Sequence, residues 1–129
     1  MKKEIKTIPE IQSPDSPFNH VVRAGEFLFL TSQLSADLKT GRILGGNIVE
    51  QTRQALENVK FLLESCGATM DDIVKVIVYM RDVTDFDKMN QVYREYFTKG
   101  QEPARVTIQA LSPIEGIEIE IEVTAVLPS

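Results

Sequence analysis

The chain has 129 residues, of which 43% are hydrophobic and 26% are charged, as is typical of one soluble domain. Lys and Arg total 14 against 19 Asp and Glu, so the net charge of -5 does not favour nonspecific binding to nucleic acid or to anionic lipid. The only cysteine, Cys66, excludes an intrachain disulfide and a thiolate metal site. We therefore expect a single domain over residues 1–129, in the reducing cytoplasm, with no nucleic-acid or membrane partner.

The N-terminal part predicts an irregular arm followed by a hairpin. Residues 1–19 contain three prolines, which is typical of a segment without regular structure. Apolar and β-branched residues then dominate 20–23 and 26–32, with Ala24-Gly25 between them as a short turn. We expect two antiparallel strands here.

A long amphipathic helix is predicted next. Asn47 with Glu50 three residues later has the spacing of a capping box, and Gly67 is a typical helix stop. Apolar residues recur on one face between these signals, at Ile48, Ala55, Leu56, Val59, Leu62, Leu63 and Cys66. The polar residues Gln51, Arg53, Glu57 and Lys60 are expected to face solvent.

The remaining elements are a strand, a second helix and two closing strands. Residues 73–79 are rich in Val and Ile and predict a buried strand. Thr84 and Asp87 are expected to cap the second helix, and the closing strands are expected at 106–110 and 117–126. The apolar stripe of the second helix, which we assign to the core, consists of Phe86, Met89, Tyr93, Tyr96 and Phe97.

This order of elements favours an α+β fold in which a mixed β-sheet has two helices packed on one face. The other face of the sheet is then uncovered. Phe18, Phe27 and Phe29 are candidates for that face, which is suited to burial in an oligomer.

Charged residues alternate with apolar ones on both closing strands. Glu118, Glu120 and Glu122 alternate with isoleucines, and Arg105 and Thr107 alternate with Val and Ile. We therefore expect Arg105 and the glutamates to share the uncovered face, where the guanidinium could hold an organic acid and a glutamate could relay protons. The alternative is a solvated face that carries ordinary surface charges.

No metal or phosphate motif is present. The sequence contains no glycine-rich phosphate loop, and its single histidine, His20, excludes sites with several histidine ligands. Cys66 ends an apolar helix stripe and is assigned no chemical role. We expect neither a metal nor a cofactor.

One pair of motifs resembles a known family, the reactive intermediate deaminases of the RidA/YjgF type. The motifs are Pro103-Ala104-Arg105 and, at the family's spacing, Ile117-Glu118-Ile119-Glu120-Ile121-Glu122-Val123. Four further segments are similar to the family in the same order, at 40–41, 54–59, 72–75 and 85–93. The resemblance covers residues 17–126.

The resemblance implies a chorismate-mutase-like (ferredoxin-like) α+β subunit that forms a homotrimer, with ligand sites in the clefts between subunits. It also implies hydrolysis of reactive 2-imino acids, 2-iminobutanoate and 2-iminopropanoate, to 2-keto acids and ammonia, without a cofactor or a metal. Such imines are released by pyridoxal-phosphate enzymes such as threonine dehydratase, which gives this chain an expected functional partner.

The resemblance also assigns roles to individual residues. It implies that Arg105 anchors the substrate carboxylate and that Glu120 activates the attacking water and handles protons. An imine carbon is already electrophilic, so orientation of substrate and water is the main task. The further substrate-binding residues that it implies are Phe18, Thr31, Ser32, Asn90 and Thr107.

Four positions depart from the family pattern. Phe18 stands where a tyrosine is common, and Ser32 replaces a glycine whose missing side chain allows close approach to the backbone. Thr107 stands where a cysteine is frequent, and Glu102 where a phenylalanine is usual. These departures bear on substrate identity.

Two other functions are compatible with the sequence. The first is a non-catalytic trimer that binds small carboxylates or keto acids through Arg105. The second is RNA cleavage or inhibition of translation, against which the net charge of -5 argues.

Overall fold

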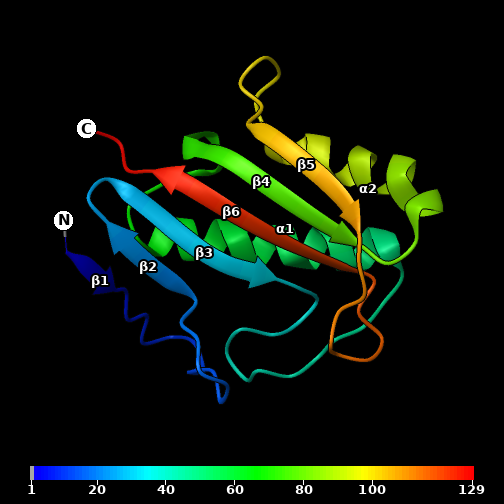
Figure 1. The fold of residues 1–129 in the computed structure, drawn as a ribbon, viewed down its shortest axis with the longest axis horizontal. Helices are drawn as coiled ribbons and strands as arrows, with labels where there is room; N and C mark the ends of the chain where they lie inside the picture. The colour runs from blue at the N-terminus through cyan, green and yellow to red at the C-terminus, as the bar shows by residue number, and fades with distance from the viewer. Residues whose placement is uncertain (1) are drawn as a thin grey trace.

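The computed structural model describes residues 2–129, which form one mixed six-stranded sheet with both α-helices on the same side (Figure 1). The expected α+β class is confirmed. The helices are α1 (Ile48–Ser65) and α2 (Phe86–Tyr93), and short 3-10 helices span Met70–Asp72, Val83–Asp85 and Arg94–Tyr96. The strands are β1 (Lys3–Ile5), β2 (Val21–Ala24), β3 (Phe27–Gln33), β4 (Ile73–Met80), β5 (Ala104–Gln109) and β6 (Ile119–Val126).

The strands lie in the order β1-β2-β3-β6-β4-β5. β4 and β5 run parallel, because the chain crosses over through α2 between them, and the other neighbouring strands are antiparallel. β4 therefore lies between the two closing strands, β5 and β6.

Helix α1 begins and ends where its sequence predicts. The Asn47 side chain accepts a hydrogen bond from the Glu50 amide at 2.9 Å, and the Glu50 carboxylate accepts one from the Asn47 amide at 3.0 Å. Gly67 follows the helix with a φ of 85°. Five residues of the apolar face are fully buried: Ala55, Leu56, Val59, Leu62 and Leu63. No helix among residues 2–129 is long and apolar enough to cross a bilayer.

The expectation that Gln51 faces solvent is wrong. Its side chain is fully buried and donates to the carbonyls of Gly46 at 2.8 Å and Gly116 at 2.9 Å. Its amide oxygen accepts a hydrogen bond from the Glu118 backbone at 2.8 Å. The polar side chain can be buried because its amide forms three hydrogen bonds with backbone groups of two loops, so neither partner is left unpaired. Gln51 thereby fixes the segment that leads into β6.

The expected cap of α2 is also wrong. Thr84 donates through its amide, at 2.9 Å, and through its hydroxyl, at 2.6 Å, to the Asp82 carboxylate. Asp82 is therefore the capping residue, and it caps a 3-10 turn that precedes the helix. α2 itself begins at Phe86, so Asp87 lies inside it rather than at its cap.

Helix α2 is shorter than its apolar stripe indicates. It ends at Tyr93, and Tyr96 lies in the 3-10 helix that follows. Met89, Tyr93 and Phe97 belong to the core, as expected, whereas Phe86 remains 41% exposed.

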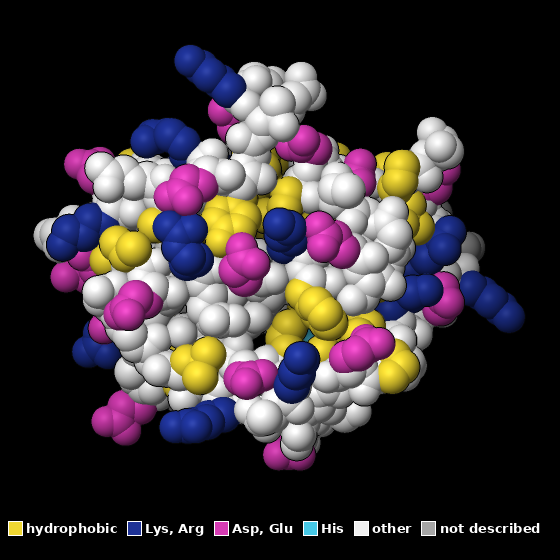
Figure 2. Space-filling model, turned by 180° about the vertical axis from the view of Figure 1, so that it is seen from behind, with side chains coloured by type: hydrophobic (Ala, Val, Ile, Leu, Met, Phe, Trp, Pro, Cys, Tyr) yellow, Lys and Arg dark blue, Asp and Glu magenta, His cyan; other side chains and the backbone are white. Residues whose placement is uncertain are grey.

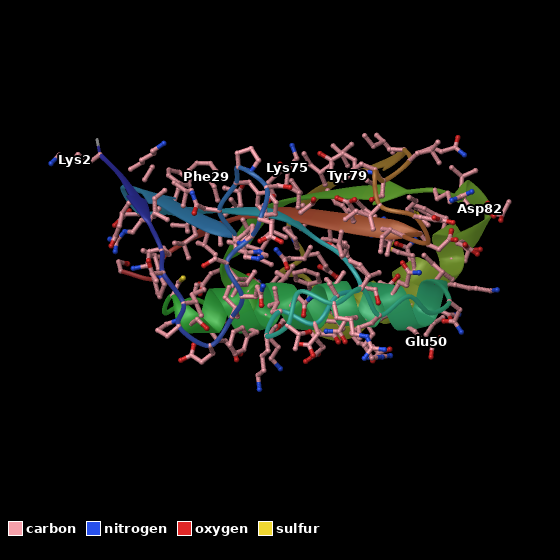
Figure 3. The ribbon with its side chains drawn as sticks, turned by 90° about the horizontal axis from the view of Figure 1, so that it is seen from below. Lys2, Phe29, Glu50, Lys75, Tyr79 and Asp82 are labelled. Atoms are coloured by element: carbon pink, nitrogen blue, oxygen red, sulfur yellow. The ribbon has the colours of Figure 1, made fainter. Side chains whose placement is uncertain are left out.

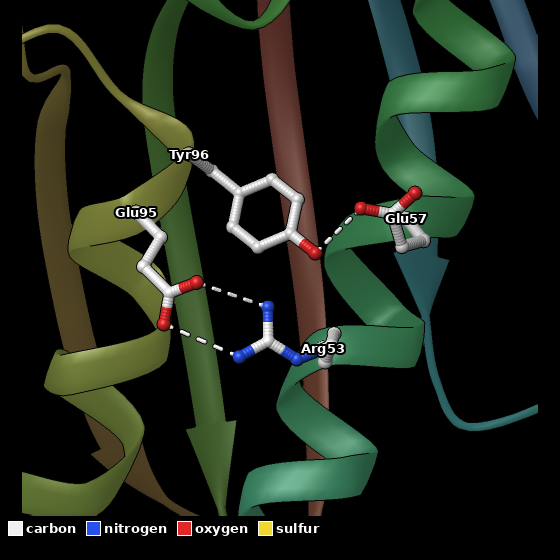
Figure 4. A network of polar contacts seen from close by, with 4 residues as sticks. All are labelled: Arg53, Glu57, Glu95 and Tyr96. Atoms are coloured by element: carbon white, nitrogen blue, oxygen red, sulfur yellow. Dashed lines mark hydrogen bonds and ion pairs between the residues drawn. The ribbon is translucent and has the colours of Figure 1, made fainter.

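Polar contacts join α1 to the segment after α2 on the solvent side (Figure 4). Arg53 donates two hydrogen bonds, of 3.1 and 3.2 Å, to the Glu95 carboxylate, and the Tyr96 hydroxyl donates to Glu57. These contacts are exposed and therefore screened by water and salt, so they orient the two segments more than they stabilise the fold.

The N-terminal arm is more ordered than its prolines indicate. Residues 3–5 form β1, which pairs with β2 at the edge of the sheet, so the expectation of an irregular arm is wrong here. All three residues are exposed, and this strand carries no apolar alternation that the sequence could reveal. Ile8 then turns into the core at 8% exposure.

The two faces of the sheet differ in character. On β6 the residues Ile119, Ile121, Val123 and Ala125 are buried on the side of the helices, as expected from their alternation with the glutamates. The side chains of Phe29, Lys75 and Tyr79 project from the opposite side, away from α1 (Figure 3). We call this side the open face. Its exposed hydrophobic side chains include Phe27, Phe29, Val106 and Ile108.

The helix side of the molecule has a mixed surface. Acidic and basic side chains are interspersed over it, with hydrophobic groups in separate patches (Figure 2). This surface is typical of one that faces water.

The expectation that Arg105 shares a face with the glutamates is wrong. In the sheet register Arg105 lies beside Val76, and Thr107 lies beside Val78. Both valines are fully buried on the helix side, so Arg105 and Thr107 point to that side as well. Val106 lies on the open face, 43% exposed. Polar and apolar residues alternate along β5 and along β6, as predicted. The polar residues of β5 lie on the helix side of the sheet, whereas those of β6 lie on the open face.

Candidate functional site

The Arg105 guanidinium is held against α2 by three side chains. One of its nitrogens donates to the Asn90 side-chain oxygen at 2.8 Å. Its central carbon lies 4.7 Å from the ring centre of Tyr93 and 5.6 Å from that of Phe86. These distances are typical of cation–π contacts. The edge strand β5 and one face of α2 therefore place a cation between two rings.

Arg105 has no carboxylate partner within residues 2–129. It is half-buried, yet the ion pairs among residues 2–129 are Lys6–Glu4 and Arg53–Glu95. A partly buried guanidinium usually pairs with a carboxylate, because desolvation of an unpaired charge is costly. The group has the planar donor geometry that binds a carboxylate through two hydrogen bonds. The arrangement is suited to an anionic ligand.

Two hydroxyl groups near Arg105 also lack hydrogen-bond partners among residues 2–129. The Tyr93 hydroxyl and the Thr107 hydroxyl are buried, and neither forms a hydrogen bond with residues 2–129. Burial raises the pKa of Tyr93 to about 12, against the opposing effect of the Arg105 charge. The phenol is therefore protonated at neutral pH. Unpaired buried hydroxyls are rare and are often found at sites of strain or function.

Glu120 lies on the open face. In the register it is beside Tyr79, and its carboxylate accepts a hydrogen bond of 2.6 Å from the Ser32 hydroxyl. The Tyr79 hydroxyl donates to the neighbouring Glu122 at 2.8 Å, and this bond raises the pKa of Tyr79. These groups line a hollow of about 180 Å³, whose other walls include Leu111, Pro113 and Glu118.

Phe18 belongs to a second hollow, of about 390 Å³, between the N-terminal arm and the loop after β3. Its ring is 46% exposed and packs edge-on against His20, with 5.8 Å between ring centres. Ser32 lines both hollows and so lies at their shared wall. Thr31 pairs through its backbone: its amide donates to the His20 carbonyl at 2.9 Å.

The sequence-derived site residues thus form two groups. Arg105, Asn90 and Thr107 lie on the helix side of β5. Glu120 and Ser32 lie on the open face, and Phe18 shares a hollow with Ser32. One chain does not bring Arg105 and Glu120 together.

Two aromatic residues of the site were missed from the sequence. Tyr93 and Phe86 were assigned only to the core stripe, although both contact the guanidinium. The signal that could have found them is the spacing of Phe86, Asn90 and Tyr93, which places the three on one face of a helix. No cluster of three or more His, Cys, Asp or Glu within residues 2–129 is arranged to hold a metal ion.

Comparison with known proteins defines the class. The sequence profile of the endoribonuclease L-PSP family matches residues 10–127, so the chain belongs to this family. A RutC family protein of Pyrococcus horikoshii is 43% identical over 123 residues, which are 95% of this chain and 97% of that protein. The resemblance to the RidA/YjgF type is confirmed by relatives with deaminase names.

One such relative is the 2-iminobutanoate/2-iminopropanoate deaminase of Mus musculus, 31% identical over 123 residues, which are 94% of this chain and 90% of that protein. Among solved structures, E. coli TdcF with bound serine is 29% identical. It matches with a TM-score of 0.85 over 97% of this chain and 99% of that one, so the two share one fold.

Proposed function

We propose that this protein hydrolyses 2-imino acids such as 2-iminobutanoate and 2-iminopropanoate to 2-keto acids and ammonia. The observation that carries the proposal is the half-buried Arg105 guanidinium, which has two aromatic contacts and an amide contact but no carboxylate partner within residues 2–129. Such a group is suited to the carboxylate of a small organic acid. Relatives named for this deaminase activity, and a similar structure with bound serine, support the same substrate class.

Hydrolysis of an imine needs few groups. Water adds to the imine carbon, and Glu120 accepts the proton that the water loses. Glu120 returns this proton to the imine nitrogen, which gives the neutral carbinolamine. Glu120 then takes the hydroxyl proton of the carbinolamine and passes it to the nitrogen, so the C–N bond breaks as the C=O bond forms, and the keto acid and ammonia are released. The residues therefore only orient the substrate and move two protons in succession, and no cofactor is required. The imine itself would come from enzymes that eliminate water from hydroxy amino acids, such as threonine dehydratase.

We further propose that each site combines residues of two subunits in a homotrimer. Arg105 and Glu120 lie on opposite faces of one sheet, so a ligand that contacts both needs Glu120 of the partner subunit. Exposed apolar side chains on the open face, at Phe27, Phe29 and Ile108, support an interface there, because water-exposed hydrophobic surface is costly.

Activity is tested by generating 2-iminobutanoate from threonine with a dehydratase and timing keto-acid formation while semicarbazide competes for the imine. Acceleration that Arg105→Ala abolishes is the expected result. No acceleration by the intact protein, with 2-oxobutanoate still bound through Arg105, would replace the proposal with non-catalytic carboxylate binding.

The two-subunit site is tested with mixed oligomers. Arg105→Ala and Glu120→Gln chains are co-expressed in equal amounts, each carrying a different tag. Random assembly leaves about one quarter of the sites with both native residues, so about a quarter of the native activity should return although each variant alone is inactive. Mixed oligomers that remain as inactive as the separate variants would contradict a shared site.

RNA is the substrate class that the family description suggests. The net charge of -5 disfavours a phosphate backbone, and we expect RNA binding to be weak even at low salt. A salt titration of RNA binding checks this.

A further inference from the structure

A β-bulge determines where Ser32 points. Leu30 pairs with Val123 and Gln33 pairs with Ile121, so β3 has one residue more than β6 between these pairs. In a regular strand Ser32 would lie on the same buried side as Leu30. Because of the extra residue, Gln33 takes the buried position, at 2% exposure, and Ser32 is only half-buried.

The bulge brings the Ser32 hydroxyl to Glu120. It donates to one carboxylate oxygen, Oε1, at 2.6 Å, a length typical of a hydrogen bond to a charged acceptor. A serine hydroxyl has one proton to donate, so this proton is not available to a substrate carboxylate. The bond fixes Oε1 and leaves the other oxygen, Oε2, for a water molecule.

We propose that Ser32 is a positioning residue that fixes the orientation of the Glu120 carboxylate. The inference rests on the proposed function, because it assigns Ser32 an effect on the water-activating group rather than on the ligand. The terminal torsion of a glutamate is broad, so a free carboxylate samples many orientations. In the family pattern a glycine stands at the position of Ser32. A glycine has no hydroxyl and would leave the Glu120 carboxylate without this hydrogen bond.

The location of Ser32 separates its effect from substrate anchoring. Arg105 lies on the opposite side of the sheet, and its contacts come from α2, far along the chain from β3. Loss of the Ser32 hydroxyl therefore disturbs proton handling while the carboxylate anchor stays intact. The expected signature is a lower kcat with an unchanged KM.

The test compares three variants in the 2-iminobutanoate assay. Ser32→Ala removes the hydroxyl, and Ser32→Thr restores it with a residue that suits a strand. Ser35→Ala is the matched control, because the Ser35 hydroxyl donates to the Gly45 carbonyl at 2.7 Å and is not part of the site. Thermal unfolding of each variant verifies that it is folded.

We expect Ser32→Ala to lower kcat roughly tenfold with KM within about twofold, because a hydrogen bond to a charged group is lost. Ser32→Thr should have most of the native kcat, and Ser35→Ala should have a kcat equal to that of the native protein. An unchanged kcat in Ser32→Ala would overturn the inference, and so would a raised KM with unchanged kcat, which would make Ser32 a ligand contact. A native protein without turnover would instead refute the proposed function, and Ser32 would then have no base to position.

Discussion

Arg105 and Glu120 lie on opposite faces of the sheet although β4 alone separates the strands that carry them. Arg105 is beside Val76, which is buried on the helix side, and Glu120 is beside Tyr79, whose side chain projects from the open face. The backbone of the sheet therefore separates the guanidinium from the carboxylate within one chain. This separation is the reason why we propose that a ligand in contact with both groups binds between two copies of the protein.

Replacement of Arg105 by lysine should weaken the binding of 2-oxobutanoate, the keto-acid product, about tenfold or more. Lysine keeps the charge but lacks the planar fork that binds a carboxylate and stacks between Tyr93 and Phe86. Isothermal titration calorimetry measures the affinity. Arg23→Lys, at a partly exposed arginine on β2 whose side chain donates to the Gly25 carbonyl, is the control and should bind like the native protein. Equal affinities for both variants would show that the anchor lies elsewhere.

Replacement of Glu120 by glutamine should lower kcat by about a hundredfold or more, because general acid–base catalysis typically contributes this much. The amide has nearly the same shape, so product affinity should change little. Steady-state kinetics and calorimetry separate the two effects. Glu115→Gln, on the exposed loop before β6, is the control. Full activity of Glu120→Gln would show that another residue carries out the proton transfer.

Tyr93 should contribute to ligand affinity through its aromatic ring and not through its hydroxyl. Tyr93→Phe removes a buried hydroxyl that has no hydrogen-bond partner in the described part of the chain, so we expect unchanged or higher thermal stability and an active protein. Tyr93→Leu removes the ring that lies 4.7 Å from Arg105 and should reduce 2-oxobutanoate affinity about fivefold. If Tyr93→Phe binds as poorly as Tyr93→Leu, the hydroxyl rather than the ring is the important group.

His20 should make stability depend on pH. Its ring is half-buried against Phe18, and its Nδ1 contacts the Gln33 amide nitrogen at 3.1 Å. Burial lowers the pKa of His20 below its ordinary value of 6.5. The unfolded chain therefore binds this proton at a higher pH than the folded chain. The contribution of His20 to the free energy of unfolding is fully present above pH 6.5. This contribution is lost as the pH falls toward the pKa of His20 in the folded state.

Urea unfolding between about pH 8 and about pH 5 measures this effect. Other groups contribute to the same slope, so the comparison is with His20→Gln, which cannot titrate. We expect the variant to lose less stability than the native protein over the lower half of this range. Identical slopes would mean that His20 titrates alike in both states.

Phe29→Asp should dissociate the homotrimer that we propose. Phe29 is 46% exposed on the open face, and a carboxylate buried there at an interface would have no partner. Sedimentation velocity measures the state of assembly. Phe61→Asp, at a phenylalanine of α1 that is 37% exposed on the helix side, is the matched control and should assemble normally. If only Phe61→Asp dissociates the assembly, the interface between subunits lies on the helix side and not on the open face.

Much of the fold follows from local sequence signals. Asn47, Glu50 and Gly67 define the ends of α1, because capping bonds and a positive φ depend only on near neighbours. The alternation of isoleucine and glutamate on β6 gives the buried and open sides of that strand for the same reason. The strand pattern made Arg105 a candidate anchor and left the choice among the glutamates open, and the resemblance to the family singled out Glu120.

Three features were decided only by the tertiary structure. The face of Arg105 depends on which β4 residue it pairs with, the direction of Ser32 depends on a bulge against β6, and the burial of Gln51 depends on backbone groups of the distant loop before β6. Each is set by contacts between segments far apart in the chain. A strand pattern gives the alternation of side chains, but the side of the sheet changes with a shift of one residue in register. The sequence therefore indicated the candidate residues, and the sheet register decided that Arg105 and Glu120 face opposite directions.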